Sequence, residues 1–246
     1  MPAEIDHTMT LRQRLRRARS VAVLTGAGVS AESGVPTFRG PDGLWRAYRV
    51  EQLATPEAFA HDPLLVWEWY DWRRQRIAAC RPNPAHQALA ALEQSVPEFL
   101  LITQNVDGLH QRAGSKAVVE LHGNIWRVRC TADNSVTENT DVPLGTVPPR
   151  CTCGAVQRPD VVWFGEPLPE TAIARAMRAA EQCEIMLVVG TSALVQPAAS
   201  LPQLTKRHRG YVIEVNLEPT PLTAYADESH YEAAGVLLPK LMASRC

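Results

Sequence analysis

The sequence predicts an α/β fold: a Rossmann-like, doubly wound parallel sheet with a small inserted module of the zinc-binding type. First, four short apolar runs alternate with longer helical patterns, an order typical of a parallel sheet covered by helices on both faces. Second, a polar, proline-rich stretch with three clustered cysteines interrupts this alternation at residues 126–159. The 246 residues suffice for one large domain. We therefore expect a single domain over 1–246, with 126–159 as the module.

The predicted strands lack strict polar alternation, as expected for strands that are buried on both faces. They are Val21–Leu24, Phe99–Thr103, Ile185–Val189 and Tyr211–Val215. The helical patterns between them are Pro63–Ala79, Pro84–Gln94 and Pro169–Gln182. Leu11 and Leu15 flank part of the basic run Arg12–Arg19 and indicate an amphipathic first helix with a solvated basic face, a better interpretation than a nucleic-acid patch.

Composition argues against several classes of partner. The formal net charge is −1, so nothing indicates binding to nucleic acid or a membrane surface. The polar start "MPAEIDHTMT" predicts no signal peptide, and no apolar run approaches the ~20 residues of a membrane span. A cytoplasmic location is expected. Disulfides are then not expected, and the clustered cysteines suggest a metal site instead.

Small, hydroxyl and amide residues follow each predicted strand. The loops read "TGAGVS", "QNVDGLH", "GTSALVQP" and "NLEPT". The carboxyl ends of parallel strands meet at one edge of a sheet, where ligands bind. Backbone N–H groups there can approach phosphates, and side chains can bind ribose. "GAG" alone would be read as a tight turn, but four such loops together predict a nucleotide site.

Five motifs in order carry a family resemblance: "GAGVSAESGVPTFRG", "TQNVDGLH", "ELHGN", "RPDVVWFGE" and "GTSALVQP". Together they closely resemble the sirtuin family of NAD-dependent protein deacylases, over roughly Val21 to Pro239. The resemblance implies that NAD and acyl-lysine proteins are the substrates, and that nicotinamide, O-acyl-ADP-ribose and free lysine are the products. The alternatives are a plain deacetylase, a mono-ADP-ribosyltransferase and a noncatalytic NAD-binding regulator.

The resemblance also implies which residues bind NAD. Those expected from the loops are Gly26, Ala27, Gly28, Ser30, Ala31, Glu32, Thr37, Phe38, Arg39, Trp45, Gln104, Asn105, Val106, Asp107, Gly190, Thr191, Ser192, Asn216, Leu217, Glu218 and Ala234. Gly26 and Gly28 would allow the backbone to approach the pyrophosphate closely. Asn105 and Asp107 could instead cap the helix that follows them, and both roles can coexist.

His122, in "ELHGN", is the expected general base, with Asn105 and Asp107 as further catalytic residues. A neutral imidazole near pH 7 suits the activation of a ribose hydroxyl. Most single histidines are structural or solvated, and we interpret the others in that way. They are His7, His61, His86, His110, His208 and His230.

The acyl group is the subject of a second pattern within the resemblance. Tyr70 and Arg73 are spaced i, i+3 and therefore share a helix face. Class III sirtuins, which prefer acidic acyl groups, carry Tyr-x-x-Arg here and a small residue at the position of Ala54. An Arg fork can bind the carboxylate of a malonyl, succinyl or glutaryl chain. Without the family, a solvated Arg73 and a core Tyr70 would be the better interpretation. Within the family, the resemblance implies desuccinylase-type activity, with succinyl, malonyl or glutaryl removed as well as acetyl.

The peptide and the metal complete the expected sites. The segment Val162, Trp163, Phe164, Gly165 and Glu166 would pair with an extended peptide and line the acyl-lysine tunnel. Family members usually bind structural zinc with two C-x-x-C pairs. Here the donors would be Cys130, Asp133, Cys151 and Cys153. Three thiolates and a carboxylate could hold one Zn²⁺ per chain, although a degenerate site is the competing interpretation.

Overall fold

The computed structural model describes residues 10–37 and 49–242. Its larger sheet has six parallel strands in the order β3-β2-β1-β7-β8-β9, which confirms the predicted fold class. The strands are β1 (Ser20–Thr25), β2 (Glu98–Thr103), β3 (Val118–Glu120), β7 (Ile185–Val189), β8 (Tyr211–Asn216) and β9 (Glu228–Tyr231). All four strands predicted from apolar runs are present, because continuous burial left a continuous apolar signal.

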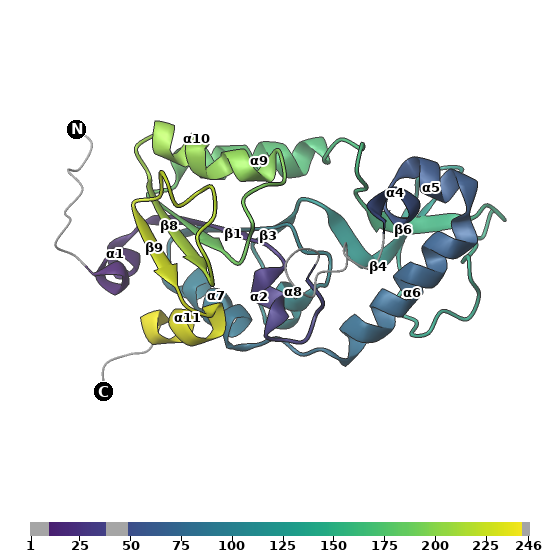
Figure 1. Cartoon of the computed structure of the whole chain (residues 1–246), viewed down its shortest axis with the longest axis horizontal. Coiled ribbons are helices and arrows are strands. Elements are labelled where there is room, and N and C mark those ends of the chain that lie inside the picture. Colours follow the sequence, from purple (N-terminus) through teal and green to yellow (C-terminus); the bar gives the residue numbers. More distant parts are fainter. Residues whose placement is uncertain (1–9, 38–48, 243–246) are drawn as a thin grey trace.

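Helices cover both faces of this sheet (Figure 1). On one face lie α1 (Leu11–Arg17), α7 (Pro84–Ser95) and α11 (Ala234–Met242), whose apolar side chains share a core with Val21, Leu101 and Ile213. On the other lie α9 (Glu170–Gln182) and α10 (Leu201–Arg207), packed on Leu24, Ile102 and Val212. Short segments complete this part: α2 (Gly28–Ala31), α8 (Leu109–Arg112) and η1 (Ala198–Ser200).

The first helix corrects one expectation. Leu11 and Leu15 are buried, as its amphipathic pattern predicts. Arg14, however, does not belong to a solvated basic face, because it is also buried and its guanidinium lies 4.4 Å from the centroid of the Tyr211 ring. The long aliphatic stem and flat guanidinium of arginine can cover an aromatic ring at the edge of a core.

A second, antiparallel sheet has the order β5-β4-β6. Its strands are β4 (Gly123–Cys130), β5 (Val136–Glu138) and β6 (Gln157–Val161). Helices α4 (Val50–Leu53), α5 (Pro56–His61) and α6 (Pro63–Ala79) pack on it and share its core, including Trp67, Ile125 and Trp163. The sheet thus extends past both ends of the predicted module 126–159. The division of the chain into one domain with that insert stays a prediction.

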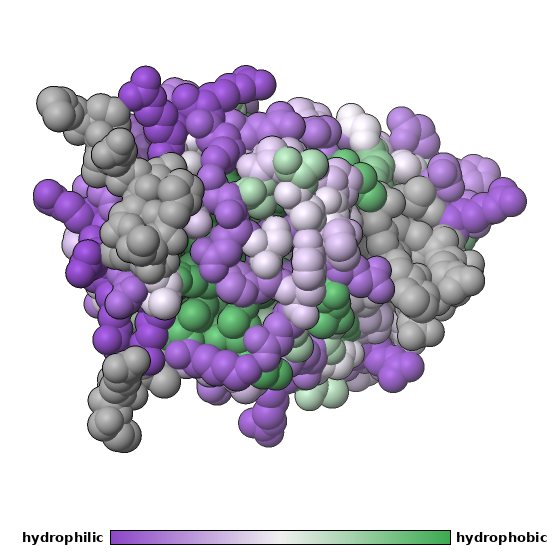
Figure 2. All heavy atoms as spheres, turned by 60° about the vertical axis from the view of Figure 1, so that its left-hand side comes forward, coloured by the Kyte–Doolittle hydropathy of each residue, from purple (hydrophilic) through white to green (hydrophobic). Residues whose placement is uncertain are grey.

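Polar residues dominate the outer surface on the face shown in Figure 2, where hydrophobic residues form only small areas among them. Within residues 10–37 and 49–242, no helix combines the length and the apolar character that a membrane span requires.

Candidate active site

A cavity of about 830 Å³ lies beyond the carboxyl ends of β1, β2, β7 and β8, and residues of α6 and of the segment that follows β6 form its other side. This is the position that a doubly wound sheet offers a ligand. Most of the expected site residues line it. They are Gly26, Ala27, Gly28, Ala31, Glu32, Thr37, Ala54, Tyr70, Arg73, Gln104, Asn105, Val106, His122, Val162, Trp163, Phe164, Gly165, Glu166, Gly190, Thr191, Ser192, Asn216, Leu217, Glu218 and Ala234.

Three glycines bring two of the cavity loops into backbone contact. The Gly28 N–H donates to the Gly190 carbonyl at 2.8 Å, and Gly190 has φ +59°. A Cβ built on Gly28 would lie 2.8 Å from the Gly190 Cα, and one on Gly26 would lie 2.8 Å from the Gly190 oxygen. Glycine is therefore required here for packing of one loop on the other, apart from any approach to a pyrophosphate.

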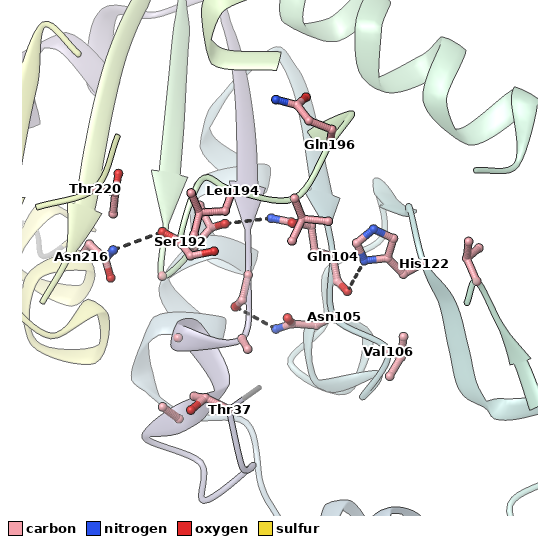
Figure 3. A pocket seen from close by; sticks show the side chains of 18 of the residues that line it. Thr37, Gln104, Asn105, Val106, His122, Ser192, Leu194, Gln196, Asn216 and Thr220 are labelled. Atoms are coloured by element: carbon pink, nitrogen blue, oxygen red, sulfur yellow. Dashed lines mark hydrogen bonds between the residues drawn. The ribbon is translucent and has the colours of Figure 1, made fainter. Parts of the chain in front are cut away.

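Amide side chains join the loops to one another (Figure 3). Gln104 Nε2 donates to Thr191 Oγ1 at 3.0 Å, and Asn105 Nδ2 donates to the Gly26 carbonyl at 3.1 Å. Asn216 Nδ2 donates to the Thr191 carbonyl at 3.1 Å. The loops after β1, β2, β7 and β8 thus form one hydrogen-bonded unit, which is suited to holding a ligand in a preformed site.

Ser30 and Asp107 lie behind this lining. Ser30 Oγ donates to Asp107 Oδ2 at 2.8 Å and accepts from Asn105 Nδ2 at 3.1 Å. The other carboxylate oxygen, Oδ1, accepts from the Leu109 N–H at 2.9 Å, so Asp107 binds the first N–H of the next helix from the position before its N-cap, Gly108. Burial raises the pKa of Asp107, and the hydrogen bonds from Leu109 and Ser30 partly oppose that shift. In this arrangement both residues orient Asn105.

His122 lines the cavity directly after β3. Its Nδ1 lies 2.9 Å from the Gln104 carbonyl oxygen. Because a carbonyl only accepts, Nδ1 carries the proton in the neutral ring and Nε2 keeps a lone pair. Burial lowers the pKa of His122 from its ordinary 6.5, and the bond to Gln104 opposes the shift. A neutral imidazole with a fixed tautomer can act as a general base.

Tyr70 and Arg73 lie on the α6 side of the same cavity, and both are buried. The Arg73 guanidinium lies 4.9 Å from the Trp69 ring centroid and 5.7 Å from that of Tyr70. The Tyr70 hydroxyl accepts from Trp163 Nε1 at 3.0 Å, so its own proton remains to be donated. Burial lowers the pKa of Arg73, and the charge of Asp107 opposes this. The interpretation of a solvated Arg73 does not hold.

The segment Val162–Glu166 is anchored within the chain. Arg158 forms a two-pronged ion pair with Glu166, at 2.6 and 2.8 Å, and lies 3.5 Å from the Trp163 ring centroid. Backbone N–H groups of the segment also have partners within the chain. Those of Val162 and Phe164 donate to the carbonyls of His122 and Ala54, and those of Trp163 and Glu166 donate to Glu166 Oε2 and the Trp163 carbonyl. Among the described residues the Gly165 N–H has no acceptor, so a peptide strand pairing here would use that N–H or carbonyl groups of the segment.

Three thiols gather at the end of the antiparallel sheet. The sulfurs of Cys130, Cys151 and Cys153 all lie within 4.8 Å of one another, and those of Cys130 and Cys153 are 3.6 Å apart. Zinc–sulfur bonds of about 2.3 Å in a tetrahedron place sulfurs about 3.8 Å apart, so the donor set fits Zn²⁺. Asp133 is not part of the group whose ligand atoms all lie within 4.8 Å of one another, although its carboxylate interacts with the Cys130 thiol. Its Oδ1 also accepts from the Ser135 amide and hydroxyl. Asp133 as a fourth ligand stays a prediction.

Three expected residues, Phe38, Arg39 and Trp45, lie outside the described residues. Conversely, the cavity includes neighbours that sequence reasoning did not single out. They are Trp69, Leu168, Leu194, Val195, Gln196, Val215, Pro219, Thr220, Pro221, Glu232 and Ala233. Leu194–Gln196 belong to the motif "GTSALVQP", so that signal was available. Trp69 gave none, because an apolar ring on a helix reads as core.

Comparison with known proteins gives a consistent set of likenesses. A family model described as the Sir2 family matches residues 26–197. NAD-dependent protein deacylase from Aquifex aeolicus is 54% identical over 90% of this chain and 93% of its own length. NAD-dependent protein deacylase 2 from Pyrobaculum aerophilum is 54% identical over 95% of this chain and 94% of its own length.

Solved structures agree with these sequence matches. A Sir2 homologue in complex with NAD has a TM-score of 0.89 and 49% identity, covering 98% of this chain and 93% of its own. A Sir2 protein with a deacetylated p53 peptide and 3'-O-acetyl ADP-ribose has a TM-score of 0.87 and 34% identity, covering 94% of this chain and 95% of its own.

Proposed function

We propose a function that rests on one premise: this chain belongs to the Sir2 family. It is accordingly an NAD-dependent protein deacylase. We further propose that it removes acidic acyl groups such as succinyl, malonyl or glutaryl from lysine side chains, as well as acetyl. The observation that carries the finer proposal is the buried Arg73 guanidinium, 5.7 Å from the centroid of the Tyr70 ring, in the wall of the same cavity as His122.

NAD supplies the ADP-ribosyl group that accepts the acyl chain, with nicotinamide as the leaving group. The chain's own residues would divide the binding between them. The glycine loop at Gly26–Gly28 and the loop at Gly190–Ser192 offer backbone groups to the phosphates, and Asn216 with its neighbours offers polar atoms to the adenosine end. Gln104 and Asn105 would hold the nicotinamide and ribose end, with Ser30 and Asp107 supporting Asn105.

His122 would take the proton from a ribose hydroxyl at Nε2, because Nδ1 is committed to Gln104. Trp163 and Phe164 would form the apolar wall around the lysine stem and keep water out. Arg73 would bind the distal carboxylate of the acyl chain, and Tyr70 would add a hydroxyl donor. Ala54 leaves room for a longer chain because its side chain is small.

A panel of acyl-lysine peptides tests the proposal. Acetyl, malonyl, succinyl and glutaryl forms of one peptide are incubated with NAD, and the products are identified by mass spectrometry. We expect free lysine and O-acyl-ADP-ribose, with higher kcat/KM for the acidic acyl groups. An acetyl preference would leave only the plain deacetylase, ADP-ribosylated protein would indicate transferase activity, and failure to consume NAD would indicate a noncatalytic regulator.

A further inference from the structure

Helix α6 presents two rows of side chains to two different surroundings. Trp67, Asp71 and Arg74 are spaced i, i+4, i+7 and point toward the antiparallel sheet, while Tyr70 and Arg73 line the cavity. At about 100° per residue, the two rows lie roughly a quarter turn apart around the helix. Any rotation of α6 that loosens the first row therefore displaces the second.

Each of the three residues in the first row forms a hydrogen bond to a segment outside α6. Trp67 Nε1 donates to the Gln157 carbonyl of β6 at 2.7 Å. One turn further on, Asp71 Oδ1 accepts from the Leu144 N–H at 2.9 Å. Both partners belong to the part of the chain that contains the cysteine cluster, and α6 runs beside β4 and β6 in Figure 1.

Arg74 makes the most extensive of these contacts and is fully buried. Its Nη1 donates to the Ile125 carbonyl at 3.2 Å, and its Nη2 donates to the carbonyls of Asn139 and Asp141 at 2.6 and 3.0 Å. Arg74 Nε has no hydrogen-bond partner among the described residues, and the bonds of the two Nη atoms offset part of the cost of burying the guanidinium. These acceptors have fixed positions in the backbone, so they hold the Arg74 side chain, and with it α6, in one orientation.

We propose that Asp71 and Arg74 are positioning residues that set the acyl selectivity of the enzyme. They fix the rotation of α6 against residues 139–144 and so fix where Tyr70 and Arg73 lie in the cavity. This inference rests on the proposed function, in which Arg73 binds an acyl carboxylate. The NAD side of the cavity is tied together separately, through the bonds among Gly26, Gln104, Asn105 and Thr191. Loss of the α6 contacts should therefore alter acyl recognition much more than NAD binding.

The test is the ratio of kcat/KM on succinyl-lysine peptide to kcat/KM on acetyl-lysine peptide, measured for Arg74→Lys and Asp71→Ala. Both peptides are assayed on the same preparation, so any loss of folded protein cancels in the ratio. We expect the ratio to fall about tenfold or more, with KM for NAD changed less than about twofold, because an ammonium cannot reproduce the fork of Arg74. Arg76→Lys is the matched control, since Arg76 is exposed on the same helix, and it should leave the ratio unchanged.

The Arg73→Met variant distinguishes failure of the positioning role of Asp71 and Arg74 from failure of the proposed acyl preference. If Arg73→Met lowers the ratio while Arg74→Lys and Asp71→Ala leave it unchanged, the positioning inference is wrong and the proposed function stands. If the wild type has no acidic preference and Arg73→Met has no effect, both fall. Should Arg74→Lys fail to fold, Asn139→Ala provides a milder change, because it removes only the Oδ1 acceptor, 2.5 Å from Arg74 Nη2. An unchanged ratio in both Asn139→Ala and Asp71→Ala would then overturn the inference.

Discussion

His122 Nδ1 lies 2.9 Å from the carbonyl oxygen of Gln104, a residue that itself lines the cavity. The bond fixes the tautomer of the proposed base and ties it to the loop that follows β2. Replacing His122 by Ala should lower the deacylation rate by about 10²–10⁴-fold, the usual cost of losing a general base. Binding of NAD, measured by calorimetry, should persist. A variant with near-normal turnover would show that another group performs this step.

The same histidine determines an acid limit for activity. Burial lowers the pKa of His122 below its ordinary 6.5, and only the neutral ring can accept a proton. We therefore expect kcat/KM on an acyl peptide to stay level as the pH falls to about 6.5 and to decline only below it. A decline centred above pH 7 would contradict the lowered pKa of His122.

Two buried histidines predict how stability depends on pH. Burial lowers the pKa of His86 to about 4 and that of His110 to about 3, and their ring centroids are 4.8 Å apart. Both groups bind protons more tightly in the unfolded chain. Their contribution to the free energy of unfolding is therefore complete above pH 6.5 and is lost as the pH falls toward 4. Each adds up to about 1.4 kcal/mol per pH unit to the slope of unfolding free energy between those values.

The experiment is urea unfolding at several pH values between 5 and 6.5. His110→Leu should make the slope of unfolding free energy against pH distinctly shallower than that of the wild type, because one of the two protons is no longer taken up on unfolding. His208→Leu is the control, since His208 is exposed. Equal slopes in all three proteins would mean that His110 is not held neutral.

Arg73→Met should reduce activity on succinyl-lysine far more than on acetyl-lysine. A carboxylate that enters the cavity loses water, and charge-assisted hydrogen bonds of roughly 1.5–3 kcal/mol each would compensate for that loss. Without the fork, kcat/KM on the succinyl peptide should fall on the order of a hundredfold. Tyr70→Phe should show the same bias more weakly, since it removes one neutral donor. Equal losses on both peptides would assign Arg73 to the support of the fold.

Zinc should be present at about one ion per chain if the three thiols form a structural site. Cys151→Ser should abolish it and lower the melting temperature, whereas Thr152→Ala, between the two cysteines, should do neither. Metal analysis and thermal unfolding provide the readouts. Wild-type protein that is free of zinc and equally stable with a chelator would indicate a degenerate site.

The parallel sheet could be predicted from sequence because strands such as Val21–Leu24 are buried on both faces and read as unbroken apolar runs. Strand β4 gave no such signal. Its Arg127 and Arg129 form ion pairs with Asp160 of β6, so two charged residues interrupt the apolar pattern of this strand of eight residues. Pairing between distant segments of this kind depends on tertiary contacts that local periodicity does not encode.

Prediction of the site residues had the same limit, because local sequence does not encode tertiary contacts. Residues within the motifs, such as Gln104 and His122, were predicted because their sequence neighbours identify them. Asp133 keeps the expected spacing, yet its Oδ1 is bound by the Ser135 amide and hydroxyl, and its carboxylate interacts with Cys130 without joining the group of three thiols. Arg74 is one of three arginines close together on α6, with Arg73 and Arg76. The sequence alone did not indicate which of them are buried.

The strands of the antiparallel sheet lie between β3 and β7 in the sequence. Strands β2 and β3 are added on one side of β1, and β7, β8 and β9 on the other. A chain that leaves β3 must cross the carboxyl edge before it reaches β7 beside β1. Because this connection starts at the carboxyl edge of the sheet, a segment inserted into it lies at the mouth of the cavity, whatever its sequence. Exchange of that insertion can remodel the wall of the cavity that contains Val162–Glu166. Tyr70 and Arg73, which lie between β1 and β2 in the sequence, and the registers of the parallel strands would stay as they are.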